Sequence, residues 1–260
     1  MNYFNLNDHR NSKLLEEELP SILISFSPIW ELSRFIQEEV RQNPSIFANV
    51  KGFIICSSSS SFTKRFSSNI FDIALSSKIA KSENNIFKYS NFLDKKCIII
   101  QPTMIYGSIS KLKDKNISKI TNLIKFLPFI LLSNKSGLRQ PIHINQLAKV
   151  FFHFTKEIAF EKETFEKYNL KTLLIGGDEE ISYEKMIKRI IKYCRKKNKI
   201  IFCKVFTLPN RIFVFILSPL IIFSPKLFAA IQRINTNLSG FVKASTITKE
   251  NIQRFPVEPF

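Results

Sequence analysis

The sequence VKGFIICSSSSS, residues 50–61, sets an apolar run directly before a row of serines. A short apolar run without alternating polar residues is typical of a strand that is buried on both faces of a parallel sheet. The runs SILISFS at 21–27, KCIIIQ at 96–101 and TLLI at 172–175 have the same character, and a proline or a glycine follows each of them. These four runs predict the central strands of the fold.

Stretches with helical periodicity separate these strands. Apolar residues recur at helical spacing in 31–42, 70–89, 116–126, 147–158 and 182–196. Ser182 is the expected N-cap of the last of these helices. Buried strands that alternate with helices predict βαβ units and a parallel sheet. With right-handed crossovers, such units form a doubly wound α/β fold. After residue 196 we expect a helical, apolar chain up to about Ile234.

Composition restricts the classes of function. The 260 residues are 45% hydrophobic, enough for a substantial core, and carry a formal net charge of +18. Such a charge attracts polyanions, but the basic residues are spread along the chain, which favours a solvated lysine-rich surface and no nucleic-acid partner. The four cysteines have neither disulfide-framework nor zinc-site spacing, so we expect no disulfide and no metal.

The N-terminal segment and the most apolar stretch of the sequence indicate where in the cell the protein is expected to be. Residues 1–20 are polar, without the apolar core of a signal peptide, and predict a weakly ordered lead-in and a cytoplasmic protein. The apolar stretch 212–225 is broken by Pro219 and is shorter than the roughly 20 residues of a spanning helix. It predicts a buried helix pair, or at most a peripheral membrane contact through residues 212–223.

Five segments, in this order, carry motif-like patterns. They are SSSSSFTK at 57–64, IQPTMIYG at 100–107, DKNIS at 114–118, GLRQPIHINQLA at 137–148 and LIGGDEEISY at 174–183. Together they resemble segments of the extended and atypical short-chain dehydrogenase/reductase superfamily, in its NAD-dependent epimerase/dehydratase group. The resemblance covers roughly residues 21–260.

That resemblance implies a Rossmann-like sheet with a small, mostly helical C-terminal substrate lobe. The core would comprise residues 21–110 with returning segments 139–177, and the lobe residues 111–138 and 178–260. It also implies NAD or NADP as cofactor and a nucleotide-activated sugar as ligand. A homo-oligomer is compatible with the resemblance. Carried over by position, the expected site residues are catalytic Ser58, Ser59 and Lys64; cofactor-binding Ser27, Pro28, Ser57, Pro102 and Thr103; and substrate-binding Tyr106, Asn116 and Arg139.

The sequence also departs from the family pattern. The family opens with a strand and a G-x-x-G-x-x-G turn, whereas the first glycine here is Gly52, which predicts an N-terminally truncated sheet without its first βαβ unit. In the helix after the serine run, Tyr89 is followed four residues later by Leu93, so the catalytic Tyr-x-x-x-Lys pair is absent there. Gln101 replaces the usual arginine and Gln146 the usual aspartate.

Two functions therefore stay open. The chain is either an NAD(P)-dependent epimerase, dehydratase or reductase of a nucleotide-activated sugar, or a non-catalytic relative that binds a sugar nucleotide or a partner protein. His143 is expected to be structural, at a strand end. Asp178, Glu179 and Glu180 favour a solvated turn over a pair of catalytic carboxylates.

Overall fold

The computed structural model describes residues 19–258 apart from 66, 68, 110–111, 115, 197–201, 220–230 and 232. The chain forms two compact units, residues 1–102 with 148–175 and residues 103–147 with 176–260. Most of the expected lead-in, and residues 220–223 of the apolar stretch, lie outside the described residues. The two units are described separately below.

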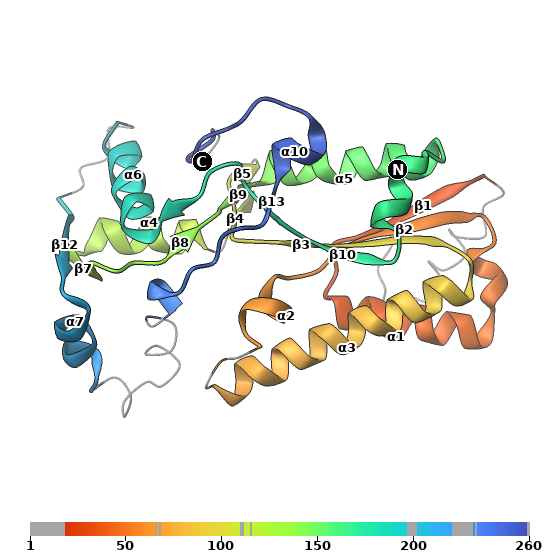
Figure 1. The fold of residues 1–260 in the computed structure, drawn as a ribbon, viewed down its shortest axis with the longest axis horizontal. Helices are drawn as coiled ribbons and strands as arrows, with labels where there is room; N and C mark the ends of the chain where they lie inside the picture. The colour runs from red at the N-terminus through yellow and green to blue at the C-terminus, as the bar shows by residue number, and fades with distance from the viewer. Residues whose placement is uncertain are drawn as a thin grey trace. The chain divides into compact units, whose positions relative to one another are not determined.

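The first unit is built on a parallel sheet (Figure 1). Its strands are β1 (Ser21–Ser25), β2 (Val50–Cys56), β3 (Lys96–Pro102) and β10 (Lys171–Gly176), which pair in that order. Phe53, Ile55 and Ile99 are fully buried, as expected for strands covered on both faces. The bounds of β2 coincide with the apolar run that precedes the serines.

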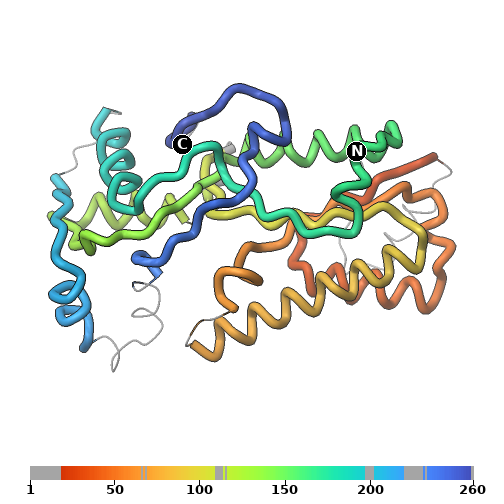
Figure 2. Tube along the Cα trace, in the orientation of Figure 1, coloured from red at the N-terminus to blue at the C-terminus, as the bar shows by residue number. Residues whose placement is uncertain are grey.

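Helices cover both faces of this sheet. They are α1 (Ile29–Gln42), the short α2 (Ser60–Thr63), α3 (Ile70–Phe92) and α5 (Ile144–Ala159), of which residues 148–159 belong to this unit. Figure 2 shows α1 and α3 side by side on one face, while α5 runs along the other. Ile158 of α5 lies within contact distance of a side chain placed at Gly52 of β2. The predicted Rossmann-like α/β fold is confirmed.

The strand order of the first unit follows the chain order. In a complete doubly wound sheet the order reverses at a switch point, where ligands bind. Between β1 and β10, the described strands show no such reversal. The truncation that the sequence predicts stays a prediction.

In its described residues, the second unit contains short strands and the helices α4, α6, α7 and α10. Its elements are β4 (Ile105–Tyr106), β5 (Ser108–Ile109), β6 (Leu112–Lys113), α4 (Ile117–Phe126), β7 (Phe129–Ser133), β8 (Leu138–Arg139), β9 (Ile142–His143), β11 (Ile181–Ser182), α6 (Tyr183–Lys196), β12 (Lys204–Leu208), α7 (Asn210–Leu217), β13 (Val242–Lys243) and α10 (Ala244–Thr248). The core of this unit includes Ile117 of α4 and Met186 and Ile190 of α6. Ser182 accepts a hydrogen bond from the Lys185 amide (3.2 Å), which confirms it as the N-cap of α6.

One sequence prediction in this unit is wrong. Residues 204–208 were expected to be helical, but they form β12, which pairs in parallel with β7. Val, Phe and Thr favour a strand, and the partner strand lies about 75 residues earlier, where no local pattern points to it. The helical stretch that follows is α7, and no helix in the described part of the chain is long and apolar enough to cross a membrane.

Candidate functional site

The carboxyl ends of three parallel strands gather polar groups at one edge of the first unit's sheet. Ser27 and Pro28 follow β1, Ser57 follows β2, and Pro102 ends β3. The register pairs Ser25 with Ile55 and Cys56 with Ile100, so these strand ends are neighbours. Ligands of open α/β sheets bind outside this edge. The structure therefore brings four of the predicted cofactor-binding residues to one edge.

A buried carboxyl group lies behind this edge. Glu83 of α3 is only 6% exposed, and its Oε1 accepts hydrogen bonds from Ser57 Oγ (2.5 Å) and Gln101 Nε2 (2.6 Å). The Gln101 amide also donates to Ser61 Oγ (2.6 Å). A helix, a strand and the serine run thus meet in one hydrogen-bonded cluster, Ser57, Ser61, Glu83 and Gln101, which we call the Glu83 cluster.

The environment of Glu83 changes its acidity. Burial raises the pKa of the carboxyl group, because the charged form loses its hydration, and the hydrogen bonds from Ser57 and Gln101 oppose this shift. The Glu83 cluster thus combines a buried carboxyl group of raised pKa with a serine hydroxyl that donates a hydrogen bond to it.

The three predicted catalytic residues have local partners. Ser58 Oγ accepts from the Ser60 amide (3.2 Å), and the Ser59 amide donates to the Pro102 carbonyl (3.4 Å). Lys64 Nζ forms an ion pair with Asp72 of α3 (2.8 Å), with both side chains largely buried. Ser58 and Ser59 therefore lie beside the Glu83 cluster, while Lys64 anchors the segment before α3. Their catalytic roles stay predictions.

In the second unit, Thr103 and Tyr106 belong to the interior framework. Thr103 Oγ1 donates to the Gln140 carbonyl (2.5 Å). Tyr106 is 1% exposed, its hydroxyl accepts from the Val257 amide (3.0 Å), and its ring meets the His143 ring edge-on. Burial raises the pKa of Tyr106 above its usual range. His143 is itself fully buried, and its Nδ1 accepts from the Asn145 amide (3.2 Å), which agrees with a structural role.

Arg139, one of the expected substrate-binding residues, is engaged by main-chain carbonyls. Its guanidinium donates to the carbonyl of Leu138 (2.7 Å) and to those of Thr236 and Arg233, and only 5% of the residue is exposed. Burial lowers the pKa of this group. In contrast, Asn116 is exposed at the start of α4. Substrate binding by these residues stays a prediction, and the contacts of Arg139 connect β8 to the 233–236 segment.

The prediction of a solvated turn after β10 is wrong for Asp178, which is buried, whereas Glu179 is half-buried and Glu180 is exposed. Asp178 is 5% exposed and accepts from the amides of Ser245 (2.8 Å) and Gln253 (2.9 Å). Gln146, in the place of the family aspartate, donates to Asp178 Oδ2 (2.9 Å). A second carboxylate at that position would repel Asp178, whereas the glutamine amide supplies a donor.

Comparisons with known proteins rest on structure. No family model matches the sequence, and no curated protein matches it. UDP-glucuronic acid 4-epimerase from Bacillus cereus, in complex with UDP-glucuronic acid and NAD, superposes with a TM-score of 0.58 at 12% identity, over 96% of this chain and 76% of that one. The chain has the fold of nucleotide-sugar epimerases. A GDP-mannoheptose C4 reductase from Campylobacter jejuni with NADP bound shares this epimerase-like fold, with a TM-score of 0.52 at 15% identity over 78% of this chain and 76% of that one.

The first unit does not fit the dinucleotide that is bound in those structures. A pyrophosphate needs a glycine-rich turn, so that the backbone approaches it closely at a helix N-terminus. The turn after β1 is Phe26–Ser27–Pro28, without glycine, and α1 begins after a proline that has no amide hydrogen. In the described residues, no glycine lies between β1 and α1 or between β2 and α2.

Glu83 was missed by sequence reasoning. It lies within a long helix whose apolar pattern is weak, and no motif marks it. It lies about four helical turns into α3 and 26 residues after Ser57, and no sequence signal points to the contact. The serine strand itself was predicted, because its apolar pattern is local.

Proposed function

We propose that this chain binds a nucleotide-activated sugar, as an epimerase/dehydratase-like protein. The observation that carries the proposal is the edge of the first unit's sheet, where the serine run and the Glu83 cluster meet at the carboxyl ends of β2 and β3. Hydroxyl groups at such an edge are suitable partners for the hydroxyls of a sugar. The epimerase-like fold supports this ligand class, since UDP-glucuronic acid is bound in a structure of that fold.

NAD or NADP is the cofactor that this fold implies. The turn after β1 lacks the glycine loop, so we propose weak NAD(P) binding by the isolated chain and assign no chemical step to the cofactor. A homo-oligomer and a cytoplasmic location stay predictions.

Calorimetric titration tests the binding function. We expect saturable binding of UDP-glucuronic acid or UDP-glucose to the purified chain, and weak binding of NAD⁺ and NADPH. The double variant S58A/S59A should lower the sugar-nucleotide affinity about thirtyfold, because each of the two lost hydrogen bonds to a ligand costs about 1 kcal/mol. Tight NAD(P) binding without any binding of sugar nucleotides would contradict the proposal.

Catalysis is the second candidate, and the Ser57–Glu83 hydrogen bond favours it. A carboxyl group with a raised pKa that bonds a serine hydroxyl is placed to hold or release a proton. The serine would contact the sugar hydroxyl, and Glu83 would act through it as a positioning residue and a proton store.

Turnover assays separate the two candidates. Conversion of a UDP-sugar in the presence of NAD⁺, followed by chromatography of the product, would support catalysis. In that case E83Q should remove a pH dependence of the rate that lies above the ordinary glutamate pKa of about 4.3, because burial raises the pKa of Glu83, while the sugar-nucleotide affinity stays within about twofold. Binding without turnover, in wild type and in E83Q alike, would leave the chain as a non-catalytic relative.

A further inference from the structure

The second unit carries an exposed apolar surface on adjoining elements. In the parallel pair of β7 and β12, Leu131 lies opposite Phe206, and both are well exposed. The Phe129 ring meets the Phe206 ring edge-on at 6.1 Å. The other side of this ribbon packs into the core through Leu132 and Val205. The ribbon therefore has one buried face and one apolar face toward solvent.

Helix α7 extends this surface. It follows β12 directly and contacts β7. Phe213 packs inward, whereas Ile212, Phe215 and Ile216 lie on one exposed helix face, with Phe215 78% exposed. We call Phe129, Leu131, Phe206, Ile212, Phe215 and Ile216 the apolar face. In Figure 1, β7, β12 and α7 lie together.

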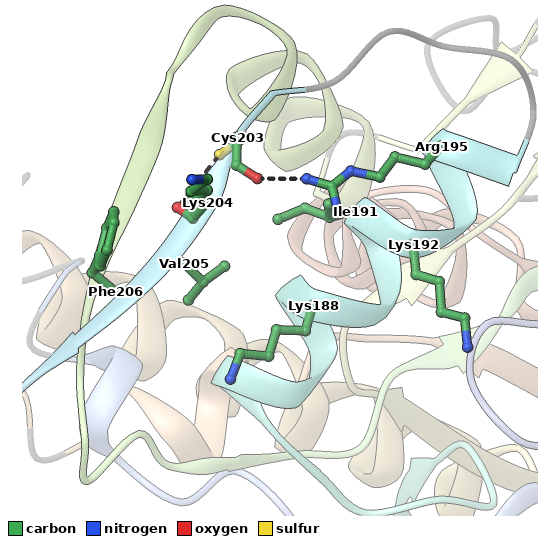
Figure 3. A pocket seen from close by; sticks show the side chains of 8 residues that line it. All are labelled: Lys188, Ile191, Lys192, Arg195, Cys203, Lys204, Val205 and Phe206. Carbon is green, nitrogen blue, oxygen red and sulfur yellow. Dashed lines mark hydrogen bonds between the residues drawn. The ribbon is translucent and has the colours of Figure 1, made fainter.

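A basic hollow adjoins the apolar face. It has a volume of about 530 Å³ and lies between α6 and β12, where Lys188, Lys192, Arg195 and Lys204 line it together with Phe206. Figure 3 shows the lysines on α6 at successive turns, with Arg195 reaching the Cys203 carbonyl (3.2 Å). Lys188 pairs with Glu184 (2.5 Å), while Lys192 and Lys204 have no ion pair with the described residues. Phe206 belongs to both surfaces.

We propose that this combined surface docks the protein on an anionic lipid bilayer. The aromatic and aliphatic side chains would enter the headgroup–acyl boundary, and the basic hollow would bind phosphate-bearing headgroups. The positive charge of this surface favours an anionic bilayer as the binding partner. Lys192 and Lys204 are uncompensated beside the apolar residues, and the net charge of +18 adds long-range attraction to an anionic surface.

A second copy of this chain is a less suitable occupant. Two copies that met through the same surface would bring their lysines together, and like charges oppose such a symmetric contact. The bilayer instead supplies the opposite charge and an apolar layer at the same place. No described helix spans a membrane, so the contact is peripheral.

Vesicle co-sedimentation tests this proposal with the full chain. We expect binding to phosphatidylcholine vesicles that contain about 30% phosphatidylglycerol, little binding to pure phosphatidylcholine, and weakening in 0.5 M NaCl, because salt screens the charges. K192E/K204E should lower the partition coefficient at least about tenfold, at about 1 kcal/mol per charge near the surface. F215D should lower it at both salt concentrations, since it removes apolar burial.

Matched variants on the first unit serve as controls. K81E/K88E changes the net charge equally, and F160D changes an equally exposed phenylalanine. Both should retain most of the binding, and circular dichroism should show all variants folded. An equal loss in K81E/K88E would assign the binding to net charge alone and overturn the proposal. If the wild-type chain did not bind the anionic vesicles, the proposal would be overturned. It would also be overturned if K192E/K204E bound vesicles as the wild type does but lost self-association.

Discussion

At the scale of single residues, several polar side chains serve the interior where the sequence suggested a ligand. Arg139 is the clearest case, because its guanidinium bonds main-chain carbonyls of two segments. Gln146 and Asp178, for which the sequence suggested no ligand, also bond each other in the interior. Sequence pattern assigns a residue such as Arg139 to a site, but only the fold decides whether its polar atoms meet ligand or backbone, since buried polar groups must find partners.

Glu83 offers a prediction about pH and stability. Its pKa is raised in the folded chain, so the stability that it contributes is complete below the ordinary glutamate pKa of about 4.3 and is lost as the pH rises through the folded value. Replacing it with glutamine keeps an acceptor for Ser57 and Gln101 and removes the charge. The free energy of unfolding of E83Q, relative to wild type, should therefore increase with pH above about 4.3.

Urea unfolding at a series of pH values measures this difference. Glu38 of α1 is exposed, so E38Q provides the same change in charge without the burial. A wild-type minus E83Q difference that stays flat from pH 4 to pH 8 would show that the carboxyl group titrates as in water.

At the scale of elements, local pattern predicted the first unit better than the second. The strand β2 and the bounds of α6 follow from apolar periodicity, which is a property of consecutive residues. The pair β7 and β12 escaped prediction, because each strand depends on a partner far along the chain. The apolar face of this ribbon lies outward, so burial gives no second signal.

The N-cap of α6 gives a prediction at this scale. The Ser182 hydroxyl satisfies the Lys185 amide, one of the donors that a helix start leaves unpaired. S182A should lower the free energy of unfolding by about 1 kcal/mol. S182D, which keeps an acceptor, should restore most of that loss in the same urea titration. Equal destabilisation by both variants would mean that the hydroxyl caps nothing.

At the scale of the whole molecule, the reactivity of the cysteine thiols depends on how deeply each thiol is buried. All four are free, and Cys97, Cys194 and Cys203 are buried. Burial raises the pKa of Cys56 and of Cys97 to about 12, so at pH 8 only about one thiol in ten thousand of either is the reactive thiolate.

We expect the native chain to react slowly with a thiol reagent at pH 8, whereas all four thiols should react at once in 6 M guanidinium chloride. A reducing agent should leave the melting temperature unchanged, since the structure holds its cysteines free. Rapid labelling of two or more thiols in the native chain would contradict the packing of both units, and circular dichroism of the labelled sample would show whether it had unfolded.

The sequence by itself determined the α/β class, the parallel strands of the first unit and the position of the serine run, because these follow from apolar periodicity and from residues adjacent in the chain. Tertiary structure alone decided that Glu83 meets Ser57 and Gln101, that Arg139 and Asp178 bond backbone groups, and that β12 pairs with β7. Each of these contacts joins residues distant in sequence. Their partners are set by the packing of whole elements, which no local pattern encodes.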